Sequence, residues 1–291
     1  ETSQDFKFSI QLLTSFLFSN KFLFSFSTVI NEKSRILLAL TKACAISGGM
    51  LENLSKKDSL RIINRAAGNY QDVIPVVKNI LEDVKQNGDQ ALIKYFEKFN
   101  GASLNYSIQV SENEIRDAYK QVDKQFIKAI KQIIKNITAV QKAQLKTKKE
   151  YVVTTEKGIS VWREWRAIEK VGIYVPGGKA VYPSSVLMTA IPAFIAGCKE
   201  VVMCSPAGSN GQIPSPTLVA ADMVGIKKIF KVGGAEAIAA MTYGTQTIPA
   251  VYKIFGAGNI YVTAAKMLAL QTVSIDMPAG PSELAVFADA T

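Results

Sequence analysis

The sequence predicts an α/β fold in which a helical segment is followed by a parallel sheet covered by helices. Two observations carry this prediction. Between residues 59 and 149 the apolar residues recur at helical spacing. From residue 171 onward, short apolar runs alternate with helical stretches and are joined by glycine-rich turns. Strands that alternate with helices in this way are typical of a parallel sheet with helical crossovers.

The helical segment contains two short apolar stripes and one long one. The stripes at 73–84 and 92–96 are each followed by an Asn-Gly pair, which is a helix stop signal. Ser111 and Glu114 have the spacing of a capping box, in which the hydroxyl and the carboxylate each accept a backbone N–H at the helix start. The apolar residues at 115–140 then predict one long amphipathic helix.

The second half of the chain begins with an expected β-hairpin. Residues 151–168 alternate in polarity and turn at Lys157-Gly158. Strands are then expected at 171–175, 200–204, 228–232, 251–255 and 273–277, and helices at 184–196, 216–223, 235–241 and 261–270. Binding loops are expected at the carboxyl ends of these strands, because ligands of open α/β sheets bind there.

Four of the strands are followed by glycine-rich loops. Without a side chain in the way, backbone N–H groups can approach a phosphate, and a helix N-terminus adds partial positive charge. None of the loops is a G-x-G-x-x-G or Walker A motif, and each alone is compatible with an ordinary turn. Their recurrence in one sheet favours a nucleotide or phosphate ligand. The loops are Pro176-Gly177-Gly178, Gly233-Gly234, Gly256-Ala257-Gly258-Asn259 and Pro278-Ala279-Gly280-Pro281-Ser282.

The composition excludes several classes of active site. The 291 residues include no histidine, so this chain alone forms no Ser-His-Asp triad and no His-ligated zinc site. The three cysteines, Cys44, Cys198 and Cys204, are too few for a disulfide framework and have no common metal-binding spacing. We interpret them as core residues in a reducing compartment and expect a cytoplasmic protein.

The net charge of +10 is concentrated in part on one expected helix face. No aromatic residues interleave with its lysines, so a solvated face is favoured over a nucleic-acid surface. These lysines are Lys120, Lys124, Lys128, Lys131 and Lys135. A basic RNA- or membrane-associated protein remains an alternative, with the Phe-rich residues 6–30 as its membrane element. Asn20 and Lys21 interrupt that run short of the ~20 residues that span a bilayer, so we expect neither a nucleic-acid nor a membrane partner.

Five sequence blocks carry a resemblance to a known family. They are VGIYVPGG (171–178), AGCKEV (196–201), KVGGAEAIA (231–239), KIFGAGNIYV (253–262) and IDMPAGPSE (275–283). In order and spacing they resemble successive blocks of histidinol dehydrogenase, and the similarity extends from about Met50 to the end of the chain. The resemblance implies a Rossmann-like, NAD-binding domain. It also implies a homodimeric oxidoreductase that contains zinc when complete and converts L-histidinol to L-histidine with two NAD.

The resemblance assigns roles to four positions. It implies that Tyr174, Glu236 and Asn259 bind NAD and that Ser282 contacts the substrate. A tyrosine ring can stack on or hydrogen-bond a dinucleotide, and an asparagine amide offers both a donor and an acceptor. A packing tyrosine and a helix-capping asparagine are the alternatives that the residues alone leave open.

The chain departs from the family pattern in three respects. Glu236 stands where the family usually has Gln, which places a negative charge near the expected phosphates. The loop Gly-Ala-Gly-Asn replaces Gly-Pro-Gly-Asn. The family's zinc ligands and acid–base pair are expected downstream of Thr291, so we assign no catalytic and no metal-binding residue and expect this chain alone to be inactive. A non-catalytic dinucleotide-binding module, or one half of a split enzyme, is the alternative function.

The expected organisation has five parts. They are a leader or upstream segment at 1–49, a helical segment at 50–150, a hairpin connector at 151–170, the Rossmann-like NAD-binding domain at 171–280, and the first strand of an incomplete remainder at 281–291.

Overall fold

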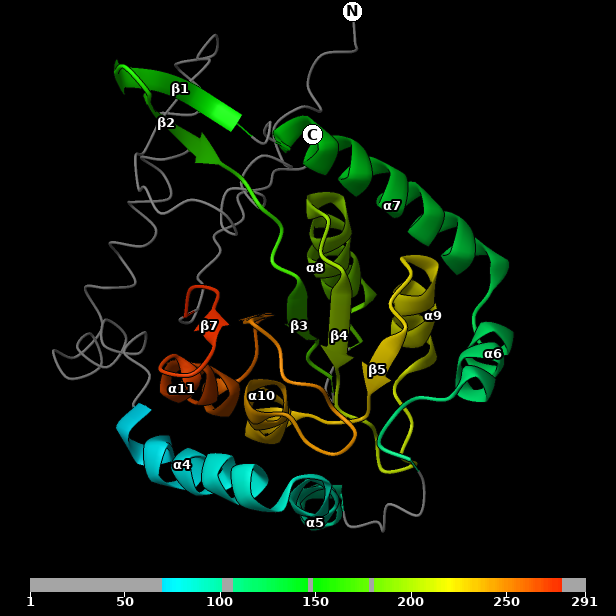
Figure 1. Ribbon diagram of the computed structural model, residues 1–291. Helices are drawn as coiled ribbons and strands as arrows, with labels where there is room; N and C mark the ends of the chain where they lie inside the picture. Colours follow the sequence, from blue (N-terminus) through cyan, green and yellow to red (C-terminus); the bar gives the residue numbers. More distant parts are fainter. Residues whose placement is uncertain (1–69, 101–106, 146–148, 178–180, 279–291) are drawn as a thin grey trace, which may run out of the picture. The chain divides into compact units, whose positions relative to one another are not determined.

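Five parallel strands form the central sheet (Figure 1). The computed structural model describes residues 70–100, 107–145, 149–177 and 181–278, all within one of the two units into which the chain divides. The strands run in the order β5-β4-β3-β6-β7 across the sheet. They are β3 (Lys170–Tyr174), β4 (Glu200–Cys204), β5 (Lys228–Phe230), β6 (Lys253–Phe255) and β7 (Ser274–Ile275).

The strand order reverses once, and this reversal defines where a ligand is expected. From β3 the chain adds β4 and then β5 on one side, and it then returns to the other side of β3 with β6 and β7. The two halves therefore meet between β3 and β6, which pair in register from Val171–Lys253 to Ile173–Phe255. In open α/β sheets the crevice at the carboxyl ends of such neighbouring strands is the usual binding place.

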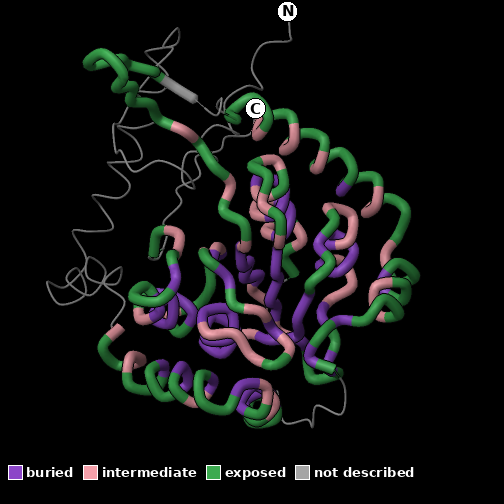
Figure 2. Tube along the Cα trace, in the orientation of Figure 1, coloured by how far each residue is buried: buried purple, intermediate pink, exposed green. Residues whose placement is uncertain are grey.

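Helices cover both faces of the sheet. Side chains of a strand point alternately to its two faces, so Val171 and Ile173 of β3 pack in one core cluster and Tyr174 packs in the other. The first face is covered by α8 (Pro183–Ala196) and α9 (Ser215–Met223), and the second by α10 (Gly234–Tyr243) and α11 (Ile260–Ala269). Figure 2 shows the buried residues concentrated in the strands and in these helices. Burial on both faces explains why the strands appear in the sequence as apolar runs.

Two N-terminal helices add a further layer on the α10 and α11 side. They are α4 (Tyr70–Asn87) and α5 (Asp89–Asn100). The apolar stripe of α4 packs against α10 and α11, and its buried residues are Val77, Ile80, Leu81 and Val84. Gly88 joins the two helices with a φ of 55°, which agrees with the predicted stop at Asn87-Gly88.

The prediction of a single long helix over residues 115–140 is wrong. The structure has two helices, α6 (Glu112–Lys120) and α7 (Lys124–Gln144). The side chain of Asp123 accepts a hydrogen bond from the backbone N–H of Phe126 and so starts α7 anew. The apolar spacing hides the break because residues of both helices pack against the same core cluster. The capping box of Ser111 and Glu114 is confirmed, and the five lysines of the basic face are exposed but are divided between the two helices.

The remaining predicted elements are confirmed in type, with bounds that differ by a few residues. The hairpin consists of β1 (Lys149–Glu156) and β2 (Ile159–Glu164), which are antiparallel and turn at Gly158 with a φ of 90°. Cys204 is buried in the core and Cys198 is partly buried. The expected leader at 1–49, with Cys44, and the expected strand at 281–291 lie outside the described residues. None of the helices in the described ranges combines the length and hydrophobicity that a membrane crossing requires.

Candidate functional site

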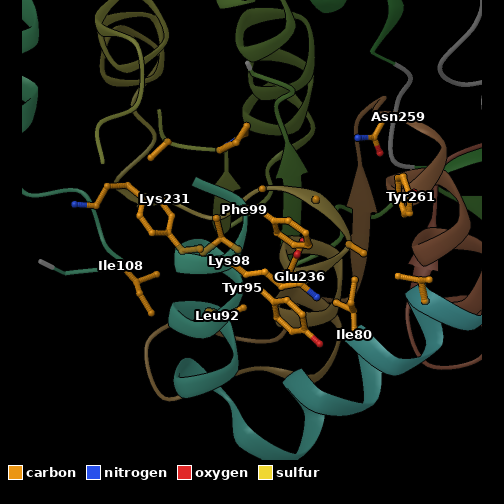
Figure 3. Close-up of a pocket in the computed structure, with 18 of the residues that line it drawn as sticks. Ile80, Leu92, Tyr95, Lys98, Phe99, Ile108, Lys231, Glu236, Asn259 and Tyr261 are labelled. Atoms are coloured by element: carbon orange, nitrogen blue, oxygen red, sulfur yellow. The ribbon is translucent and has the colours of Figure 1, made fainter. Parts of the chain in front are cut away.

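A cavity of about 610 Å³ lies where the loops after β4, β5 and β6 meet helices α4 and α5 (Figure 3). The loops contribute Pro206, the turn Gly233-Gly234 and Asn259 to its wall. The helices contribute mostly apolar and aromatic side chains. The cavity therefore combines backbone at strand ends with an apolar wall, which is the usual make-up of a site for an organic cofactor.

The turn Gly233-Gly234 forms the start of helix α10 at this cavity. Gly233 is the N-cap and offers no side-chain acceptor to the first helical turn, so the N–H groups there depend on other partners. Gly234 has a φ of 63°, which favours glycine. A Cβ at Gly233 would lie 2.5 Å from Cβ of Pro206, so the close approach of the two loops also requires glycine there. The sequence thus builds a helix N-terminus without a side-chain cap, and its partial positive charge attracts anions.

Tyr174, predicted to bind NAD, is 5% exposed and packs in the core on the α10 side of the sheet. Its hydroxyl oxygen accepts a hydrogen bond from the backbone N–H of Gly234 at 3.3 Å. Burial is the main cause that raises the pKa of Tyr174 to about 12, so the phenol stays neutral at physiological pH. Of the four predicted positions, Glu236 and Asn259 line the cavity, whereas Tyr174 supports the turn beside it.

Glu236 lies in the first turn of α10 and is 5% exposed. Its carboxylate lies against Gly234, because a Cβ at Gly234 would overlap Oε2 of Glu236. Burial raises the pKa of Glu236 to about 7, and a hydrogen bond from its own backbone N–H opposes that rise. The carboxylate therefore occupies the helix N-terminus where an anionic ligand group is expected.

Asn259 performs the capping role that the sequence left open as an alternative. Its Oδ1 accepts a hydrogen bond from the backbone N–H of Val262 at 3.1 Å and thereby caps α11. The residue also lines the cavity (Figure 3). Because capping uses the oxygen, the amide nitrogen is the polar group that Asn259 can offer to a ligand. Ser282, the predicted substrate contact, lies outside the described residues.

Sequence reasoning did not find the part of the cavity wall that α5 supplies. The rings of Tyr95 and Phe99 are stacked with their centroids 6.0 Å apart and their planes at 13°. Both line the cavity together with Lys98, and Phe99 is 62% exposed. The helical spacing marked Tyr95 as a core position only, and no local motif links α5 to the glycine loops.

Lys231 is a second residue at this site to which the sequence analysis assigned no role, although it begins the block KVGGAEAIA (231–239). It is 3% exposed, and its Nζ pairs with Oε1 of Glu114 at 3.0 Å. Glu114 also completes the capping box of α6, so this ion pair joins the loop after β5 to the start of α6. A lysine that directly follows the apolar strand residues Ile229 and Phe230 was the signal available in the sequence.

The described residues do not fit a zinc ion. Among them no three His, Cys, Asp or Glu side chains come together as a possible ligand set. The cavity wall is instead suited to a ligand that binds through stacking, backbone N–H groups and an amide.

Comparison with known proteins identifies the family. A family model described as histidinol dehydrogenase matches residues 63–291. The chain belongs to the histidinol dehydrogenase family. The histidinol dehydrogenase of Methanocaldococcus jannaschii is 46% identical over 241 residues, which are 83% of this chain and 56% of that protein. That of Bacteroides fragilis is 48% identical over 229 residues, which are 78% of this chain and 53% of that protein.

A solved histidinol dehydrogenase supports the same assignment and the α/β fold. The crystal structure of the enzyme from Elizabethkingia anophelis matches with a TM-score of 0.69 and 46% identity, over 72% of this chain and 48% of that one. The chain thus spans about half the length of the histidinol dehydrogenases it matches.

Proposed function

We propose that the cavity binds NAD and that the chain supplies the dinucleotide-binding part of a histidinol dehydrogenase. The observation that carries this proposal is the glycine N-terminus of α10, which has no side-chain cap and lines a cavity with aromatic rings in its wall. A dinucleotide needs both features, because its pyrophosphate is anionic and its rings are planar. Family membership supports the choice of NAD over another nucleotide.

Each side of the cavity has a role in this proposal. The Gly233-Gly234 turn brings the partial positive charge of the α10 N-terminus to the pyrophosphate, while the N–H of Gly234 donates to Tyr174. Phe99 and Tyr95 offer ring faces to a base, and the amide nitrogen of Asn259 donates to a ribose or phosphate oxygen. Tyr174 holds the turn in place through Gly234. NAD, when bound, supplies the chemistry of accepting a hydride from the substrate carbon.

The wider activity follows from the family. We propose that the site serves the oxidation of L-histidinol to L-histidine in the cytoplasm, that two NAD are used, and that the complete protein is a homodimer with Ser282 at the substrate. We also propose the division of the chain at residues 150, 170 and 280 that the sequence predicts. The described residues provide no fitting ligand set for zinc, so none of them is proposed to bind it.

Calorimetric titration of NAD tests the proposal, and two variants of Asn259 separate its roles. Asn259→Ala removes the cap and the amide, whereas Asn259→Ser keeps a good capping side chain and removes only the amide. We expect NAD to bind the parent chain and both variants to bind it about tenfold more weakly, with a loss of stability confined to the alanine variant. Parent-like affinity in Asn259→Ser would limit Asn259 to capping, and no binding by the parent chain would overturn the proposed function.

A further inference from the structure

A buried ion pair lies behind the loop that leads to Asn259. Lys266 of α11 is 4% exposed, and its side chain pairs with that of Asp276, which directly follows β7. Both side chains also bind the backbone of Gly256, the first residue after β6. Nζ of Lys266 donates to the carbonyl oxygen of Gly256 at 2.8 Å, and Oδ2 of Asp276 accepts from its N–H at 2.8 Å.

We propose that Lys266 and Asp276 are positioning residues that hold the loop Gly256–Asn259 in its cofactor-binding conformation. Together they bind both polar backbone groups of Gly256, so the peptide groups on either side of this residue are held in orientation. The loop is short, and Asn259 at its other end starts the same helix that carries Lys266. The pair therefore connects the end of β6, the start of α11 and the segment after β7. This inference rests on the proposed NAD site.

Gly256 itself fits this role. Its φ is 127°, which L side chains rarely adopt, and a Cβ there would overlap the carbonyl oxygen of Tyr174. The end of β6 thus touches the end of β3 at the place where the strand order reverses. Without a side chain, Gly256 can be held only through its backbone, and the ion pair supplies the donor and the acceptor for it.

The chemistry of the pair also favours a positioning role over one in stability alone. Lys266 lies among buried alanines of α11, where a lone ammonium would be strongly disfavoured. A buried ion pair is often no more stabilising than apolar side chains of similar size. Apolar residues cannot bind the N–H and the carbonyl of Gly256. What the pair adds is therefore the orientation of the loop.

Three variants of the full 291-residue chain test this. Lys266→Met and Asp276→Leu each remove one charge together with its hydrogen bond to Gly256, so they leave a buried partner unpaired and lower stability. The double variant Lys266→Met/Asp276→Leu leaves no unpaired charge and is expected to be more stable than either single variant. The matched control is Lys228→Met, which breaks the more exposed pair with Glu200 between neighbouring strands β5 and β4.

Two readouts separate positioning from stability. Hydrogen exchange without NAD should show faster exchange of the amides of residues 256–259 in all three variants, and NAD should bind them about tenfold more weakly. The double variant decides between the two roles, because its affinity should stay low although its stability exceeds that of the single variants. The control should match the parent in both measurements.

Several results would overturn the inference. Parent-like exchange at residues 256–259 in the single variants would show that the pair does not order the loop. Parent-like NAD affinity in a folded double variant, or in Asp276→Leu if the double variant does not fold, would show that the pair serves stability alone. If the parent chain itself binds no NAD, the proposed function fails, and the exchange measurement still decides whether Lys266 and Asp276 hold the loop.

Discussion

The hydroxyl oxygen of Tyr174 accepts a hydrogen bond from the backbone N–H of Gly234 at 3.3 Å. This contact joins the end of the central strand β3 to the first residue of α10. The loop after β5 therefore passes β4, which lies between β5 and β3 in the sheet. A buried tyrosine thereby gives a partner to one of the N–H groups that a helix start leaves without an intrahelical acceptor.

Removal of the Tyr174 hydroxyl is the first prediction. Tyr174→Phe keeps the ring in the core but leaves the N–H of Gly234 without this acceptor, which should lower the free energy of unfolding by about 1 kcal/mol. Urea unfolding measures the change. Tyr252→Phe is the control. Tyr252 is 56% exposed, so the removal of its hydroxyl costs only hydrogen bonds to water. Equal stability of Tyr174→Phe and the parent would show that the contact contributes nothing.

The second prediction concerns Glu236. Because its pKa is raised to about 7, the carboxylate is charged above neutral pH and then repels a pyrophosphate at the N-terminus of α10. Glu236→Gln removes the charge and keeps the shape, so at about pH 8 it should bind NAD about fivefold more tightly, equivalent to about 1 kcal/mol. The affinity of the parent should rise as the pH falls from about 8 to about 6, and that of the variant should not.

The raised pKa of Glu236 also predicts how the free energy of unfolding changes with pH. The pKa of Glu236 is higher in the folded chain, about 7, than its ordinary value of 4.5. Between these values the folded state binds more protons than the unfolded state, so this group's contribution to stability falls as the pH rises from 4.5 to about 7. Urea unfolding of Glu236→Gln and the parent across this range should show a difference that grows with pH. A difference that stays constant with pH would mean that folding does not raise the pKa of Glu236. Weaker NAD binding by the variant would mean that the carboxyl instead accepts a hydrogen bond from the cofactor.

The third prediction compares two glycines with positive φ. Gly256→Ala adds both backbone strain and an overlap with the carbonyl oxygen of Tyr174, whereas Gly158→Ala adds strain only, since no atom lies within 4 Å of the new Cβ. We expect the hairpin variant to lose about 1 kcal/mol of stability and the Gly256 variant to lose clearly more, as thermal unfolding would show. Similar losses would mean that β3 and β6 do not meet as closely as the structure shows.

The fold followed from the sequence because its determinants are local. The strands β3 and β4 are short apolar runs buried on both faces, and glycine-rich loops mark the ends of four of the predicted strands. The break between α6 and α7 was missed because Asp123 acts through its own side chain and leaves the apolar spacing intact. Capping of this kind is visible in the sequence only as a residue type, and aspartate has many other roles.

The site could be predicted from the sequence only in part, because its wall is assembled from segments that lie far apart in the sequence. The glycine loops were found, since backbone approach to a ligand demands glycine locally. Phe99 and Tyr95 were not found, because α5 is brought to the loops by tertiary contacts with residues far away in the sequence, such as the hydrogen bond of Asp89 with Thr247. Lys266 and Asp276 were missed for the same reason, since their common partner is the backbone of a residue on a third element.

Hydrogen exchange of the 291-residue chain with and without saturating NAD tests the central claim most directly. If the cavity is the NAD site, NAD should slow exchange in residues 231–239 and 256–262 and in the part of α5 that carries Tyr95 and Phe99. Helices α7 and α9, which pack on the other face of the sheet, should exchange as before. Protection confined to that other face, or no protection at any NAD concentration, would contradict the account.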